Sequence, residues 1–177
     1  MKNSELATTQ KENDFIKHVI PNIKPTTSIK LLYRGSRDGW KPFDFHRLCD
    51  NQGPTVSLIK SSSGRLAGGF TSVSWTSQSQ WQNDAKALVF SVDSEVKFPC
   101  LQPANAVYHY SEYGPSFGDT YLAIRGMNQK NGSYCAFTGS SYDNGYFKVT
   151  DHIYGNSILT GEGGKGARFT CVELEVF

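Results

Sequence analysis

The sequence predicts a mainly β protein, a β-rich α+β fold in which an antiparallel two-sheet β-sandwich is flanked by short helices. Aromatic residues make up 13% of the chain and occur together with 17 Gly and 7 Pro, a composition typical of strands joined by turns. About eight short apolar segments alternate with clusters of turn residues, as in β-sandwiches. A length of 177 residues indicates one domain with a single substantial core.

At the N-terminal side, we predict that residues 1–28 form a helical arm and a linker, and that residues 29–177 form the domain itself. One helical stripe contains four apolar residues: Phe15, Ile16, Val19 and Ile20. Pro21 ends this helix, because proline cannot continue the helical hydrogen bonding. We expect the helix to pack on the domain; the alternative is that it ends a segment lying further upstream.

Residues 31–75 predict a strand, a tight turn at residues 35–39, a short helix and then two more strands. Pro42 suits the first turn of that helix, where its missing N–H is not needed. Gly53 ends the helix, because glycine accepts a positive φ. The polar residues 76–84 predict a surface loop.

In the second half of the chain, the apolar run at residues 87–92 predicts a central strand covered on both faces. Residues 112–118 are rich in turn formers and predict a crossing rather than a strand. Apolar positions alternate along the closing segment, residues 169–177, but the alternation changes phase by one residue, which indicates a bulge near Val172. Further short strands are expected at residues 96–100, 107–110, 121–124, 134–137 and 146–149.

Five ordered motifs of this chain resemble those of one known family. They are LLYRGSRDG at residues 31–39, CDNQGPTVSLIK at 49–60, GGFTSVSW at 68–75, YGPSFGD at 113–119 and FTCVELEVF at 169–177. Together they resemble the TLDc domain, over roughly residues 29–177. The resemblance implies two antiparallel sheets with short flanking helices, and it brings no agreed enzymatic chemistry. It further implies a eukaryotic protein with links to oxidative-stress resistance and to the peripheral subunits of the vacuolar proton ATPase.

Charge and targeting signals restrict the classes of partner. The net charge of +2 is too small to indicate a nucleic acid or an anionic membrane as partner. No window of the sequence contains 18 consecutive apolar residues, so no transmembrane segment is predicted. Because the sequence shows no secretory signal, we expect a cytoplasmic protein whose four cysteines are reduced and buried. Two disulfides are the alternative.

Few residues of the sequence are candidates for metal binding or catalysis. None of the four histidines is spaced for a metal from a helix, and we expect neither a metal nor a cofactor. Glu173 and Glu175 share one face of the closing strand about 7 Å apart, and close like charges can create a general acid. The alternatives are a solvated strand face or ion pairs with Arg34 or Arg37. Cys49 lies near a helix C-terminus, where the dipole disfavours a thiolate.

Two hypotheses of function follow. The first is a non-enzymatic protein-interaction domain that uses exposed loops on a rigid body. Its candidate partner-binding residues are Trp40, Trp81, Glu162 and Lys165. Tryptophan is enriched at the energetic centres of interfaces, although Trp81 could also lie back over the core edge. The alternative is a hydrolase or redox enzyme that uses Glu173 and Glu175 or a cysteine.

Overall fold

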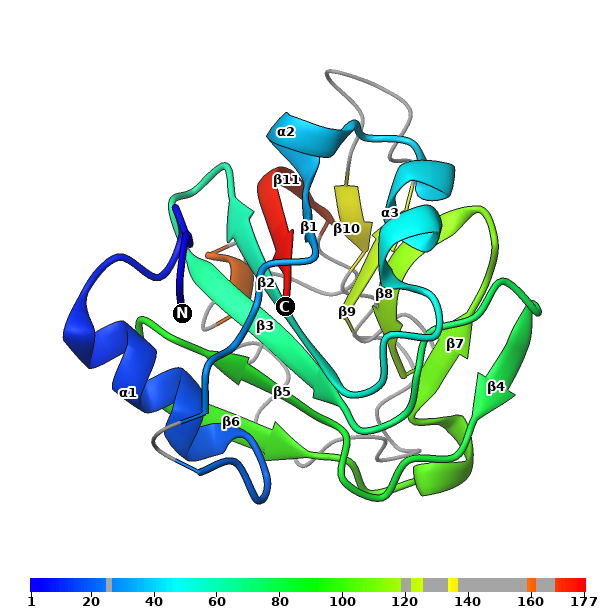
Figure 1. Ribbon diagram of the computed structural model, residues 1–177, viewed down its shortest axis with the longest axis horizontal. Helices are drawn as coiled ribbons and strands as arrows, with labels where there is room; N and C mark the ends of the chain where they lie inside the picture. The colour runs from blue at the N-terminus through cyan, green and yellow to red at the C-terminus, as the bar shows by residue number, and fades with distance from the viewer. Residues whose placement is uncertain (25–26, 119–121, 126–133, 137–158, 162–167) are drawn as a thin grey trace.

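The computed structural model describes residues 1–24, 27–118, 122–125, 134–136, 159–161 and 168–177. Most of the regular secondary structure in this part of the chain belongs to two antiparallel sheets (Figure 1), which confirms the predicted β-rich class. The described helices are α1 (Gln10–Val19), α2 (Gly35–Asp38), α3 (Pro42–Cys49) and the 3-10 turn η1 (Pro103–Asn105). The described strands are β1 (Tyr33–Arg34), β2 (Thr55–Ser61), β3 (Leu66–Thr71), β4 (Gln80–Gln82), β5 (Leu88–Ser91), β6 (Val96–Pro99), β7 (Val107–His109), β8 (Tyr113–Phe117), β9 (Leu122–Arg125), β10 (Tyr134–Ala136) and β11 (Arg168–Val176).

Strand β11 belongs to both sheets. In the first sheet the strand order is β6-β5-β3-β2-β11, with β1 paired to the end of β11; in the second it is β4-β7-β8-β9-β10-β11. The register of β11 shifts between Cys171 and Glu173, so the bulge predicted near Val172 is confirmed. The bulge turns the first half of the strand toward β10 and the second half toward β2.

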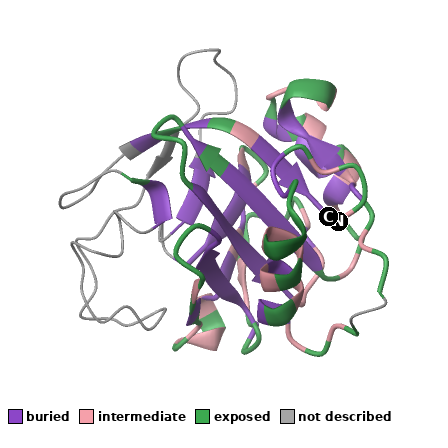
Figure 2. Ribbon diagram, turned by 90° about the vertical axis from the view of Figure 1, so that its left-hand side faces the viewer, coloured by how far each residue is buried: buried purple, intermediate pink, exposed green. Residues whose placement is uncertain are grey.

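The first sheet carries an apolar cluster on each face. Between the sheets, Trp75 makes edge contacts with Phe45 and Phe117. The opposite face of the same sheet is covered by α1 and the chain that follows it. Because both faces are covered, β3 and β5 are buried along their whole length (Figure 2), as predicted for residues 87–92.

Helix α1 is the helix expected from the apolar stripe. Thr9 caps its first turn through a capping box with Glu12, and Ile16 and Val19 are buried against the first sheet. Pro21 follows the last residues of the helix, as expected. The placement of a domain boundary after residue 28 stays a prediction.

Three segments differ from their predicted conformation. Residues 35–38 form the single helical turn α2 where a tight turn was expected. Residues 80–82 form the edge strand β4 inside the predicted loop, paired with β7. Residues 113–117 form β8 despite their turn formers, because a register irregularity between Tyr113 and Ser116 accommodates Gly114 and Pro115. The strand expected at residues 146–149 lies outside the described residues.

Candidate functional site

The carboxylate of Glu175 lies out of solvent and is surrounded by donors. It accepts hydrogen bonds from Arg34 Nε at 2.8 Å, Ser4 Oγ at 2.6 Å and the Glu5 backbone N–H at 2.8 Å. Arg34 Nη2 lies 2.7 Å from the same carboxylate. Of the alternatives open for this face, the ion pair with Arg34 is therefore present. This arrangement ties the N-terminal arm to β1 and β11, and it favours a structural role for Glu175 over proton transfer.

Glu173 lies two residues away and is half-buried. Its Oε1 accepts hydrogen bonds from the backbone N–H of Ser36 at 3.1 Å and of Leu174 at 3.0 Å. One oxygen thus fixes the N-terminal turn of α2 to the closing strand. The structure places both predicted carboxylates beside the β1–α2 segment, and their use in catalysis stays a prediction.

Among the described cysteines, Cys49 and Cys100 are poorly suited to nucleophilic chemistry. Burial, with a smaller contribution from Asp50, raises the pKa of Cys49 well above its ordinary range. Burial also raises the pKa of the half-buried Cys100. Cys171 lies in the core, where its thiol donates to the Glu173 carbonyl at 3.3 Å. These three described cysteines are unpaired, and the raised pKa values keep Cys49 and Cys100 in the neutral thiol form.

His46 links helix α3 to the second sheet through hydrogen bonds. His46 Nδ1 lies 2.8 Å from Asp50 Oδ1, and its Nε2 lies 3.1 Å from the carbonyl oxygens of Tyr110 and Tyr113. The ring therefore joins α3 to the turn between β7 and β8. Across the described part of the chain, no group of three His, Cys, Asp or Glu residues is arranged to hold a metal ion.

Trp40 covers α2. A Cβ added at Gly35 would lie 2.6 Å from the indole of Trp40, so the absence of a side chain at Gly35 admits the ring. The indole is half-buried against the apolar cluster between the sheets. The other two predicted contacts of this kind, Glu162 and Lys165, lie outside the described residues.

Trp81 begins a row of four half-buried aromatic side chains, which we call the aromatic row: Trp81, Tyr108, Tyr110 and Tyr113. The ring centroid of Trp81 lies 4.7 Å from that of Tyr108, its cross-strand partner. Tyr108 stacks on Tyr110 at 5.8 Å, and Tyr110 meets Tyr113 edge-on at 4.6 Å. Sequence reasoning missed the tyrosines, although the i, i+2 spacing of Tyr108 and Tyr110 places both on one face of a strand.

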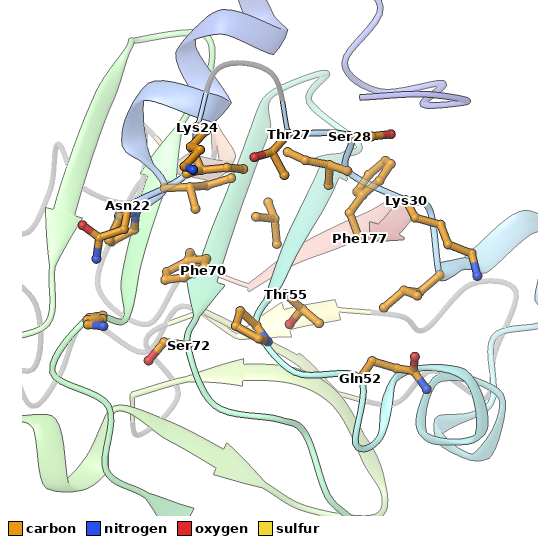
Figure 3. A pocket seen from close by; sticks show the side chains of 18 residues that line it. Asn22, Lys24, Thr27, Ser28, Lys30, Gln52, Thr55, Phe70, Ser72 and Phe177 are labelled. Atoms are coloured by element: carbon orange, nitrogen blue, oxygen red, sulfur yellow. The ribbon is translucent and has the colours of Figure 1, made fainter.

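A second surface feature is a groove of about 590 Å³ on the face of the first sheet that carries α1, which we call the arm groove. One wall is the chain after α1, the other is the segment of residues 27–32, and β2, β3 and Phe177 provide apolar floor residues. Figure 3 shows Phe70 on this floor, with Asn22 and Lys24 on one side and Gln52 at the opposite edge. The arm groove was not predicted, because its walls and its floor come from segments far apart in the sequence.

Comparison with known proteins identifies the family. The TLDc domain family matches residues 1–177, the whole chain, so the protein belongs to that family. It is also similar to proteins named MTOR-associated protein MEAK7. The similarity is 32% identity over 75% of this chain and 28% of the Gallus gallus protein, and 28% identity over 64% of this chain and 25% of the Danio rerio protein. The chain thus spans about a quarter of the length of these relatives.

The structure adds one observation on membranes. None of the helices in the described residues combines the length and the apolar character needed to cross a bilayer.

Proposed function

We propose that this TLDc domain is a non-enzymatic protein-interaction domain and that the aromatic row is its partner-binding surface. The observation that carries the proposal is the contact series from Trp81 on the edge strand β4 to Tyr113 on β8. Trp and Tyr are enriched among the residues that dominate interface energies. Because these rings already pack on one another, binding would order few additional rotamers.

The family resemblance supplies the finer proposal. We propose that the partner is a peripheral subunit of the vacuolar proton ATPase, that the protein acts in the cytoplasm, and that binding contributes to resistance to oxidative stress. The relatives named MTOR-associated protein MEAK7 suggest a second candidate partner, an assembly that contains MTOR. In either case Trp40, Glu162 and Lys165 are proposed as additional contacts.

The enzymatic alternative has less support. Glu175 is held by Arg34, Ser4 and Glu5, and burial disfavours a thiolate at Cys49. A hydrolase or redox site would require groups that face a substrate-sized cavity, and the lining of the arm groove includes neither of the two candidate glutamates nor a cysteine.

The test uses purified protein and the purified peripheral domain of the vacuolar ATPase. The Trp81→Ala variant is expected to weaken binding about 30-fold, the effect of removing a residue worth about 2 kcal/mol. Phe43→Ala is the matched control, because Phe43 is an aromatic residue outside the row with an exposed fraction of 69%. Thermal unfolding of both variants separates loss of binding from loss of fold.

Equal binding by wild type and Trp81→Ala would remove the aromatic row as the partner surface. If only Phe43→Ala loses binding, the partner-binding surface must instead include α3. If the ATPase domain does not bind at all, the same variants are tested against a purified MTOR-containing assembly, and absence of binding there as well would overturn both proposed partners.

A further inference from the structure

The arm groove has an apolar floor and a rim of one charge sign. Its floor includes Val56 from β2, Phe70 from β3 and Phe177 after β11. Its walls add the half-buried apolar side chains of Ile23 and Ile29. A volume of about 590 Å³ lies within the range of sites that hold small ligands or a few side chains.

The charges of the rim are all positive. Lys24, Lys30 and Lys86 line the groove, and all three are exposed. Among the described residues, no Asp or Glu lines it. The nearby Asp84 is buried behind the rim, where its carboxylate accepts hydrogen bonds from Thr71, Ser72 and the Lys86 backbone. An occupant that complements this rim carries negative charge beside apolar groups.

Uncharged polar groups on the rim favour an acidic peptide over an anionic lipid as the occupant. Asn22 and Gln52 each present an amide that can both donate and accept, and Thr27 and Ser28 present exposed hydroxyls. A peptide main chain offers matching donors and acceptors along its length, whereas an acyl chain offers none. The rim residues Asn22 and Gln52 lie on opposite sides of the floor (Figure 3), so an extended chain across the groove can meet both.

We infer that the arm groove binds a short extended peptide segment of a partner protein in which acidic residues flank bulky apolar ones. The apolar side chains occupy the floor over Val56 and Phe70, and the carboxylates lie near Lys24, Lys30 and Lys86. This site does not depend on the aromatic row. Helix α1 and strand β4 lie at opposite ends of the long axis of the molecule (Figure 1), so the two surfaces can be occupied independently.

The experiment measures fluorescence anisotropy of a labelled synthetic peptide that alternates glutamate with leucine and phenylalanine, added to the full chain. The double variant Lys24→Glu, Lys30→Glu is expected to weaken binding about tenfold, because two exposed attractive charges become repulsive. Lys97→Glu on β6 is the control for a single charge reversal outside the groove and is expected to bind as wild type does. The Ile23→Asp variant tests the apolar wall, and thermal unfolding confirms that each variant is folded.

Two further probes separate charge from composition and peptide from lipid. The same peptide with every glutamate replaced by glutamine is expected to bind about tenfold more weakly and to lose most of its salt dependence. Vesicles of phosphatidylcholine and phosphatidylserine are expected not to bind. Equal affinity for the two peptides, equal affinity of the double variant, or binding of vesicles without binding of the peptide would each overturn the inference.

The outcome is separable from that of the proposed function. Trp81→Ala is expected to bind the acidic peptide as wild type does, because Trp81 does not line the arm groove. The double lysine variant is expected to keep the binding that depends on Trp81. If Trp81→Ala also abolishes peptide binding, the two surfaces are not independent and the assignment of the peptide to the groove is wrong.

Discussion

Glu175 shows how one buried side chain can fix the position of several segments. Its carboxylate is held by Arg34 on β1 and by Ser4 and Glu5 on the arm. The guanidinium of Arg34 also reaches the Asn3 carbonyl and the Glu5 carboxylate, each at 2.5 Å. A buried charge is stable only when its partners stay in place, so this pair holds the arm, β1 and β11 in one arrangement.

Replacement of Arg34 by Met is expected to lower the free energy of unfolding by about 3–5 kcal/mol, because it leaves the Glu175 charge buried without its cation. Arg37→Ala is the matched control. Arg37 pairs with Asp38 at 2.7 Å, but its side chain is 46% exposed, so its loss is expected to cost less than about 1 kcal/mol. Urea unfolding followed by circular dichroism gives both values. Equal values for the two variants would contradict the buried-pair argument.

His109 makes stability depend on pH. Burial lowers its pKa from the ordinary 6.5 to about 4, and its Nε2 has no hydrogen-bond partner in the residues that the structure describes. Between these two pH values the unfolded chain binds a proton that the folded chain does not. Stability is therefore expected to fall as the pH falls from 6.5 toward 4, by about 3 kcal/mol in total.

The measurement is the free energy of unfolding at several pH values in this window, for wild type and His109→Leu. The variant is expected to lose this component of the slope, because leucine does not titrate. Carboxylates contribute to both curves, so the difference between the two proteins isolates the histidine. Parallel curves would show that His109 does not titrate differently in the folded and unfolded chains.

At the residue scale, the sequence predicts the face that a side chain occupies better than the partner it meets. The shared face of Glu173 and Glu175 follows from strand periodicity alone. The choice of Arg34 over Arg37 as partner depends on the pairing of Arg34 with Glu175 across β1 and β11. The residue type alone makes Trp81 a candidate for partner binding. The aromatic row, however, forms only because β4 pairs with β7 and brings Trp81 beside Tyr108.

At the scale of elements, β11 is the joint between the sheets. Its bulge lets Phe169 and Cys171 pack between the sheets, and it restores the same orientation for Leu174 and Val176 after the phase change. Val172 at the bulge has an exposed fraction of 48%. We therefore expect the fold to tolerate loss of the Val172 side chain but not loss of the extra backbone residue.

Deletion of Val172 is expected to prevent folding, because a shift of one residue turns one half of β11 over and moves its apolar side chains to the wrong face. Val172→Ala is the control and is expected to change the free energy of unfolding by less than about 1 kcal/mol. The comparison uses near-UV circular dichroism and thermal unfolding. A cooperative transition in the deletion variant at the temperature of wild type would refute the role of the bulge.

Elements with regular apolar alternation were predictable, and those formed by pairing alone were not. The phase change in residues 169–177 predicted the bulge directly. By contrast, β4 consists of Gln80, Trp81 and Gln82, which have no apolar alternation, and it is a strand only because β7 pairs with it. Propensity is a weak guide for such edge strands, because pairing partners decide their conformation.

At the scale of the whole molecule, the first sheet is the middle layer between two apolar clusters. The outer cluster joins Ile16 and Val19 of the arm to Leu58, Phe70 and Phe90 of the sheet. The arm therefore supplies part of the core rather than only covering a surface. The sequence predicted a helix at the right place, but the extent of its packing depends on the sheet face that it meets.

A chain that begins at residue 29 is expected to lose cooperative unfolding and to self-associate, because the outer face of the first sheet is then exposed. Size-exclusion chromatography and thermal unfolding measure both effects. A monomer with the unfolding midpoint of the full chain would instead establish residues 29–177 as an independently folding domain.

The position of β11 along the chain has a consequence for biosynthesis. Ribosomes make residues 168–177 after every other described strand, yet β1, β2 and β10 all hydrogen-bond to this segment. A nascent polypeptide that stops before Arg168 lacks the link between its two halves and keeps apolar surface uncovered. Completion of the fold therefore waits until translation of these residues is over, and chaperones have that interval in which to bind the chain.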